Sequence, residues 1–168
     1  LYGGLSAVAW TDIIQVVVLV LGGFVTTYLA LDTVSGGDGF FGGLVKIYDS
    51  VPERFDMILE KSNPEYMNLP GIGVLIGGMW IANLYYWGFN QYIIQRTLAA
   101  KSLAESQKGI LFAAGLKMII PIIVVIPGIA AYVIVNDPSL LSSLGDAGMA
   151  NIPSASQADK AYPWLMQF

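Results

Sequence analysis

The chain contains no cysteine and no histidine among its 168 residues. Without cysteine there can be no disulfide, thiolate metal ligand or thiol nucleophile, and without histidine the commonest acid–base and metal-binding side chain is missing. Charged residues make up only 12% of the chain, whereas soluble domains contain about 25%. The formal net charge is −4, and no basic patch suited to nucleic acid occurs. These shortages argue against an enzyme and against a nucleic-acid-binding protein.

Hydrophobic residues, in contrast, make up 55% of the chain and gather in long runs. A helix needs roughly 20 apolar residues to cross the hydrocarbon layer of a bilayer, and two of the runs exceed that length. We therefore predict an all-α protein, a polytopic transmembrane helix bundle, with helices at about 5–31, 69–95 and 104–135. The chain opens at Leu1 without a charged leader and stops at Phe168 without a polar tail, and we expect it to be an internal piece of a larger membrane protein.

The charges of the connecting segments predict the orientation of these helices. Residues 96–108 hold three basic side chains against one acidic, whereas residues 32–65 hold three basic against seven acidic. Because basic residues in short loops favour the cytoplasm, we place the loop 96–104 inside and the loops 32–68 and 136–168 outside. Apolar residues recur at helical spacing in the first external loop, which predicts one or two short amphipathic helices, and Ser50 and Glu53 fit a capping box there.

Polar and aromatic side chains form a stripe along the predicted helix 69–95. Because they recur at intervals of three and four residues, these side chains would share one face of a continuous helix. Amides that lack water in hydrocarbon need a partner or a cavity, and amides with aromatic rings are the groups that recognise sugars. Adhesion between helices is the alternative, since such amides often bridge membrane helices. The stripe favours a substrate or ion pathway and consists of Asn83, Tyr86, Trp87, Asn90 and Gln91.

Lys117 lies deep inside the predicted helix 104–135. A charge at mid-bilayer costs at least about 2.5–3.5 kcal/mol, so the residue needs a polar cavity or a partner. Three interpretations stay open from the sequence: the ammonium binds a substrate hydroxyl, pairs with a buried carboxylate, or extends toward the cytoplasmic interface. The first interpretation indicates a protein that moves a solute across the bilayer.

Asp12 is the only acidic residue inside an apolar span. It either interacts with a helix N-terminus at the interface, where the helix dipole favours an anion, or provides a waypoint for a cation on the inner side. Gly73 and Gly77 make a GxxxG pair that favours close helix packing. The same glycines do not make a nucleotide-binding loop, because no strand precedes them.

Two stretches carry a family resemblance. GGLSAVAWTDIIQ (residues 3–15) and YYWGFNQYIIQRTLAAKSLAESQKG (residues 85–109) resemble the sodium/solute symporter family, and within it the bacterial members that carry sodium together with galactose or glucose. The resemblance implies part of a fold of five-plus-five helices in inverted repeats. It implies sodium-coupled sugar symport by alternating access in the cell membrane, the bacterial inner membrane. An amino-acid or vitamin symporter, or a passive channel or structural subunit, is the alternative.

The resemblance also assigns roles to residues already singled out. It implies that Asn83 and Lys117 hydrogen-bond the sugar, that Tyr86 covers the sugar as the inner gate, and that Trp87 lies beside it. Asp12 corresponds to the family's inner sodium exit, and Asn90 and Gln91 extend the polar lining. The main sodium site of the family uses other helices, so we expect no complete metal site in this chain. The implied partners are galactose or a related hexose, sodium, lipid and the remaining helices of the same transporter.

Overall fold

The computed structural model of the chain describes residues 4–69 and 71–167. These residues form helices and connecting loops, and no strand occurs among them. They divide into two compact units: unit 1 comprises Leu1–Pro52 and Ile119–Phe168, and unit 2 comprises Glu53–Met118. The helix α5 (Leu103–Asn136) begins in unit 2 and continues into unit 1.

Two long apolar helices agree closely with the sequence prediction. The helix α1 (Gly4–Ser35) covers the predicted range 5–31, and α5 covers the predicted range 104–135. Both are long and apolar enough to cross a membrane, and no other helix of the described residues passes that test of length and composition. Most apolar side chains of the first half of α1 are exposed on the chain by itself, as is typical of a helix that lipid or neighbouring helices cover.

The predicted continuous helix 69–95 is instead interrupted. A π-helical turn, η3 (Val74–Gly78), leads into α3 (Met79–Gly88), and a separate helix, α4 (Gln91–Leu98), follows. The backbone is extended at Asn90, where φ is −71° and ψ is 115°. Glycine weakens a helix and asparagine favours its N-terminus, so Gly88 and Asn90 account for the interruption. Pro70, which falls in the first turn of the predicted helix 69–95, lies outside the described residues.

Short helices occupy the segment between α1 and η3, as the amphipathic pattern predicted. They are α2 (Gly39–Ser50) and two 3-10 turns, η1 (Pro52–Phe55) and η2 (Pro64–Asn68). The predicted capping box is wrong, because Ser50 is the last residue of α2 and its hydroxyl donates to the carbonyl of Lys46 at 2.7 Å. Ser50 therefore belongs to α2, and it does not occupy the position before η1 that an N-cap requires.

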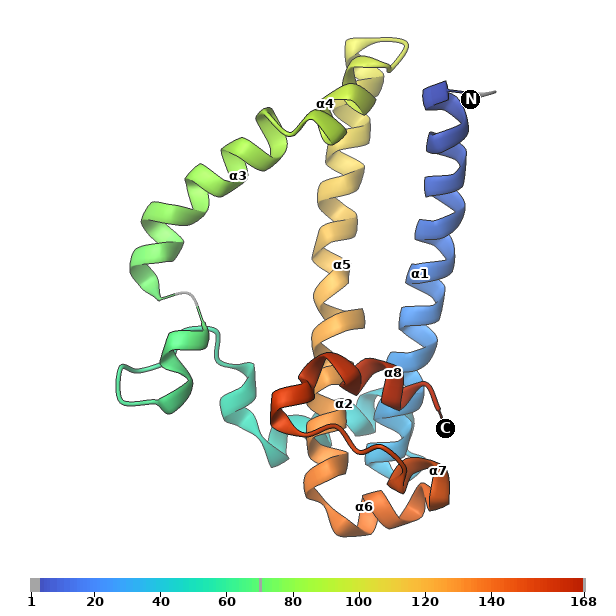
Figure 1. The fold of residues 1–168 in the computed structure, drawn as a ribbon, viewed down its shortest axis with the longest axis vertical. Helices are drawn as coiled ribbons and strands as arrows, with labels where there is room; N and C mark the ends of the chain where they lie inside the picture. Colours follow the sequence, from blue (N-terminus) through green and yellow to red (C-terminus); the bar gives the residue numbers. More distant parts are fainter. Residues whose placement is uncertain (1–3, 70, 168) are drawn as a thin grey trace. The chain divides into compact units, whose positions relative to one another are not determined.

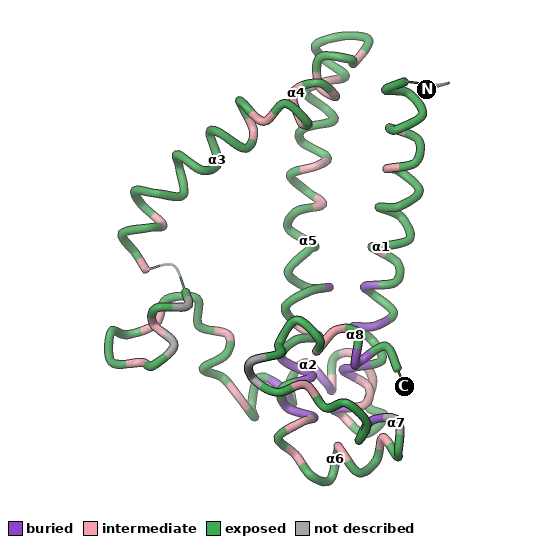
Figure 2. The backbone as a smooth tube through the Cα atoms, viewed as in Figure 1, coloured by how far each residue is buried: buried purple, intermediate pink, exposed green. Residues whose placement is uncertain are grey.

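The core of unit 1 forms where α2 folds back on α1. Leu31, Val34 and Ile47 are completely buried, and Gly43 lies so close to Leu31 that an added Cβ would meet the Leu31 carbonyl oxygen at 2.2 Å. Figure 2 shows that the buried positions gather at the end of α1 next to α2. Earlier in α1, Gly23 lies against the side chain of Ile123 of α5, whose Cβ an added Cβ would meet at 3.0 Å. Small residues let these backbones approach closely, as is common between membrane helices.

The last part of unit 1 consists of short helices (Figure 1). Asp137 caps the first of them by accepting from the backbone N–H of Ser139 and from its hydroxyl, and these hydrogen bonds lower the pKa of Asp137. The buried Trp164 donates its Nε1–H to the carbonyl of Gly148 at 3.1 Å, which fastens the chain end. The helices are α6 (Pro138–Ser143), α7 (Gly145–Met149), η4 (Ala155–Lys160) and α8 (Ala161–Leu165).

The close approach of α2 to α1 predicts that the stability of the protein depends strongly on the size of the side chain at Gly43. We expect Gly43→Ala to lower the free energy of unfolding by about 1–3 kcal/mol, because the added methyl forces α2 away from the backbone of α1. Thermal unfolding of the full-length protein in detergent measures the effect. Gly22→Ala is the matched control, since its Cβ would meet nothing within 4 Å. Equal melting temperatures for the two variants would contradict the packing described here.

Candidate functional site

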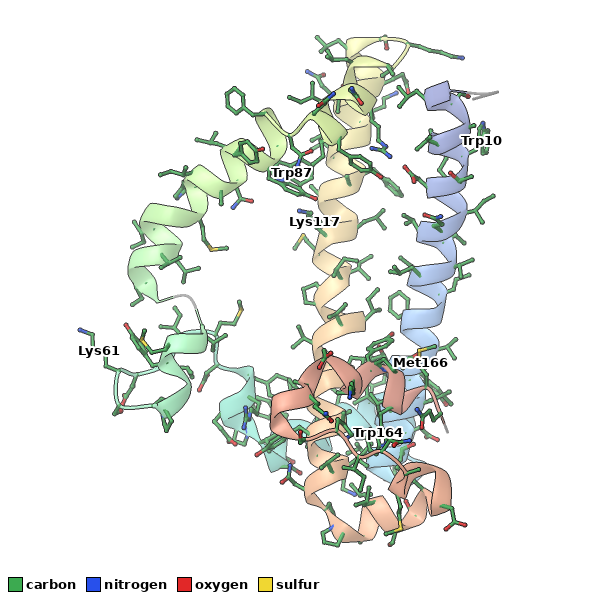
Figure 3. The ribbon with its side chains drawn as sticks, in the orientation of Figure 1. Trp10, Lys61, Trp87, Lys117, Trp164 and Met166 are labelled. Carbon is green, nitrogen blue, oxygen red and sulfur yellow. The ribbon has the colours of Figure 1, made fainter. Side chains whose placement is uncertain are left out.

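The ammonium of Lys117 lies against two aromatic rings of α3. Its Nζ is 4.1 Å from the centroid of the Tyr86 ring and 4.8 Å from the centroid of the Trp87 ring. All three residues belong to unit 2, and Figure 3 shows Trp87 and Lys117 pointing toward one another from α3 and α5. A cation this close to ring faces is attracted by their negative π surface. The three residues form the aromatic–lysine cluster.

The two rings of the cluster are arranged as a corner. Tyr86 and Trp87 are sequence neighbours on α3, their centroids are 5.5 Å apart, and their planes meet at 84°. This edge-to-face geometry is a favoured arrangement for aromatic pairs. Trp87 is half-buried, whereas Tyr86 keeps 41% of its surface exposed. The corner therefore presents ring surface to the Lys117 ammonium and to any solute that reaches it.

Lys117 has no carboxylate partner among the described side chains of unit 2. The acid nearest to it in sequence, Glu105, pairs with Lys108 at 3.2 Å. The structure thus supplies a partner that the sequence analysis did not consider, because the open interpretations for Lys117 were a hydroxyl, a carboxylate and the interface. The sequence contains an aromatic pair of the kind that attracts a lysine, but it does not specify that α3 and α5 bring these residues together.

Asn83 lies on the same face of α3 as the aromatic pair. Residues three and four positions apart are neighbours on a helix surface, so the spacing from Asn83 to Tyr86 and Trp87 brings these three predicted site residues together. The side-chain nitrogen of Asn83 donates to the carbonyl of Met79 at 2.9 Å. One donor of the amide is therefore used within the helix, as is expected for an amide in an apolar setting.

Asn90 and Gln91 do not extend this stripe, because α3 has ended before them. The side chain of Asn90 accepts from the backbone N–H of Tyr92 at 3.0 Å and caps α4. The residue that looked like part of a polar lining thus has a local structural task. Gln91 is the first residue of α4 and is exposed.

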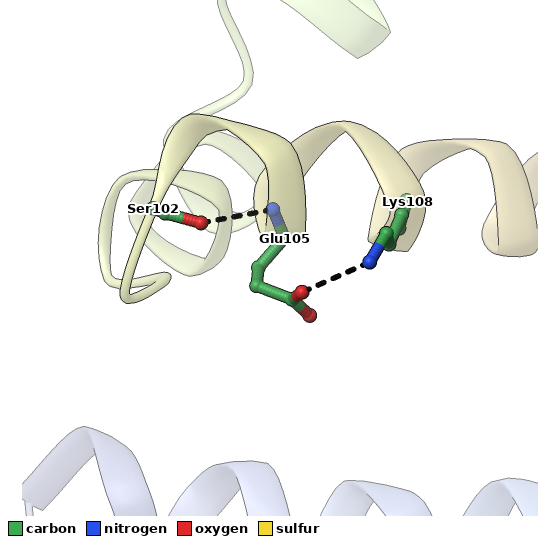
Figure 4. Close-up of polar contacts among 3 residues, drawn as sticks. All are labelled: Ser102, Glu105 and Lys108. Atoms are coloured by element: carbon green, nitrogen blue, oxygen red, sulfur yellow. Dashed lines mark hydrogen bonds and ion pairs between the residues drawn. The ribbon is translucent and has the colours of Figure 1, made fainter.

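Two sets of side-chain contacts, one in α4 and one at the start of α5, were not predicted from the sequence. The guanidinium of Arg96 stacks 3.4 Å from the centroid of the Tyr92 ring, and its Nη1 donates to the Tyr92 carbonyl at 2.9 Å. The four-residue spacing on a helix could have indicated this contact. At the start of α5, the hydroxyl of Ser102 accepts from the backbone N–H of Glu105 at 3.3 Å, beside the pair of Glu105 with Lys108 (Figure 4).

Asp12 lies on α1 in unit 1 and is half-buried. It belongs to a different unit from the aromatic–lysine cluster. Within residues 4–69 and 71–167, no group of three or more aspartate or glutamate side chains is placed to hold a metal ion.

In a comparison with known protein families, the model of the sodium:solute symporter family matches the whole chain, residues 1–168. The chain is 68% identical over its full length to the sodium/glucose cotransporter of Vibrio parahaemolyticus, of which it covers 31%. It is 37% identical over 98% of its length to the uncharacterized symporter YidK of Escherichia coli, of which it covers 25%. It is also 34% identical over 80% of its length to the human sodium/myo-inositol cotransporter 2, of which it covers 21%. The chain spans a third or less of the length of these relatives.

The cap formed by Asn90 predicts a graded response to substitution. We expect Asn90→Ala to destabilise the start of α4 by about 1 kcal/mol, because the Tyr92 amide loses its acceptor, whereas Asn90→Ser keeps a capping oxygen. Hydrogen exchange of the full-length protein measures the effect at the Tyr92 amide. We expect faster exchange in Asn90→Ala and near-native exchange in Asn90→Ser; identical exchange in both variants would rule out the capping role.

Proposed function

The chain belongs to the sodium:solute symporter family, and we propose that the full-length protein carries sodium and a sugar together across the cell membrane. Members of this family are multi-pass membrane transporters and not enzymes. The 68% sequence identity with a sodium/glucose cotransporter supports a hexose such as galactose or glucose as the solute. The two membrane-length helices α1 and α5 support a location within the bilayer, and a bacterial inner membrane fits the bacterial relatives.

The contact of Lys117 with Tyr86 and Trp87 is the observation that carries the proposal. It places a hydrogen-bond donor beside two flat apolar surfaces. A sugar offers the complementary groups, since its hydroxyls accept from an ammonium and its C–H faces cover aromatic rings. Asn83, on the same face of α3, adds an amide that bonds hydroxyls as donor or acceptor. We assign these four residues to the sugar site, with Tyr86 as its inner gate.

Sodium enters the proposal as the driving ion. Asp12 provides a waypoint for sodium on the inner side, and the remaining helices of the transporter hold the main sodium site. Sodium favours the outward-open state only through its higher affinity for that state, and rocking of the helix bundle then opens the inner side. One positive charge that moves inward gains about 2.3 kcal/mol per 100 mV of membrane potential. In this arrangement the loop 96–104 faces the cytoplasm, and the loops 32–68 and 136–168 face outside.

Uptake into vesicles containing the full-length protein tests the proposed activity. We expect labelled galactose to accumulate above its external concentration in the presence of a sodium gradient, and to equilibrate without accumulation when potassium replaces sodium. Labelled proline is the control solute and should not accumulate. Accumulation of proline but not galactose would identify an amino-acid symporter, and flux that ignores sodium would identify a channel.

The proposed sugar contact predicts the effect of removing the ammonium. We expect Lys117→Ala to weaken galactose binding about 10- to 100-fold, because a hydrogen bond from a charged donor contributes about 1.5–3 kcal/mol. Binding per folded molecule is measured by titration of purified full-length protein. Lys101→Ala, in the exposed turn before α5, is the matched control and should bind galactose normally. A loss of folded yield with unchanged binding per molecule would show that Lys117 is structural.

A further inference from the structure

We propose that the π-helical turn η3 sets the rotation of α3 about its own axis and thereby turns the solute-contacting residues of α3 toward Lys117. This inference rests on the proposed function, because it concerns how the same sugar site is positioned. It assigns a task to residues 74–78, which lie outside the site itself. A π-helical turn is rare and frequently lies beside a functional site, and this one directly precedes the helix that carries Asn83, Tyr86 and Trp87.

The turn accommodates one more residue than a regular helical turn does. The backbone N–H of Met79 donates to the carbonyl of Val74, five residues earlier, whereas an α-helix bonds residues four apart. Residues 72–73 before the turn and 79–88 after it are α-helical. Each residue of an α-helix adds a rotation of about 100° and a rise of about 1.5 Å. The extra residue in η3 therefore decides which side of α3 faces a given direction.

Contacts hold the chain on both sides of the turn. Before it, the carbonyl of Gly71 accepts from the N–H groups of Val74 at 2.9 Å and of Leu75 at 3.1 Å. Gly71 also lies against Tyr66 of η2, whose hydroxyl an added Cβ would meet at 3.2 Å. After the turn, two rings of α3 lie against the Lys117 ammonium. With Gly71 in place, the same residues in an unbroken α-helix would rotate these rings away from Lys117 by about 100°.

The turn is also joined to the sugar site through Met79. The N–H of this residue closes the turn at Val74, and its carbonyl accepts from the side-chain nitrogen of Asn83 at 2.9 Å. The residue that ends η3 thus also orients the amide that we assign to the sugar hydroxyls. A change in the turn is therefore passed directly to a group of the proposed site.

Deletions and insertions in the full-length protein test this role of η3. Deletion of Gly77 removes the extra residue, so a regular α-helix can replace the turn with the site facing the same way, and we expect near-native galactose affinity. An alanine inserted between Gly77 and Gly78 rotates α3 by about 100°, and deletion of both glycines rotates it as far in the opposite sense. We expect each of these two changes to weaken galactose binding about tenfold or more, because the proposed contacts to the sugar are misplaced.

Titration of the purified protein measures galactose binding per folded molecule. An alanine inserted between Lys61 and Ser62, in the exposed turn before η2, is the matched control and should bind galactose normally. A plain α-helix would suffer equally from one residue added and one removed. Equal weakening by deletion of Gly77 and by the insertion beside it would therefore overturn the inference. Normal binding by all the η3 variants would overturn it as well, since the turn would then set no rotation.

Hydrogen exchange of the native protein decides if deletion of Gly77 prevents folding. Galactose should slow the exchange of the amides of residues 74–79, because a sugar that holds the face of α3 also holds the turn that positions it. Residues 44–50 of α2 are the control, and their exchange should not change. Equal exchange of residues 74–79 with and without galactose would contradict the role of η3.

The proposed function fails separately from this inference. Without sodium-dependent galactose uptake by the native protein, the symport proposal is wrong. Normal uptake by the native protein, combined with equal losses from the deletion of Gly77 and the insertion beside it, leaves symport intact and contradicts only the role of η3.

Discussion

The cost of placing one positive charge at membrane depth constrains the rest of unit 2. Lys117 can lie inside an apolar helix only if its ammonium finds a favourable surface there. Tyr86 and Trp87 supply that surface, and they do so because α3 presents two adjacent rings at nearly right angles. An aromatic surface differs from a carboxylate in one respect: it attracts the ammonium without neutralising its charge.

Particular residues show what the sequence could predict. The apolar runs predicted α5 to within one residue at each end and α1 to within one residue at its start and four at its end, because a run of 20 or more apolar residues is a strong signal for a membrane-length helix. Asn83, Tyr86 and Trp87 also lie on one face of α3, as periodicity alone implied, whereas Asn90 and Gln91 of the same predicted stripe do not. The partner of Lys117 could not be derived, since it depends on which face of one helix meets another. Nothing in a single sequence specifies that pairing.

The interruption at Asn90 was hidden for a different reason. Its signals, a glycine at position 88 and an asparagine two residues later, are local and weak, and they sit within a stretch whose overall apolar character indicates a continuous span. The structure resolves the conflict through one side-chain cap, from Asn90 to the Tyr92 amide. As a result, Asn90, which periodicity assigned to the solute path, caps a helix. The aromatic–lysine cluster accordingly lies close to the end of the short helix α3 rather than midway along a long helix.

The close backbone contact between Gly43 and Leu31 has a practical value for observing the molecule at work. Since α2 has no space to slide on α1, the two helices should move as a single body. The flank of α2 that carries Phe41 and Tyr48 is exposed, so a spin label or fluorophore attached there would report displacements of the C-terminal end of α1. A probe on the short helix α2 could thus follow the movement of the long helix α1.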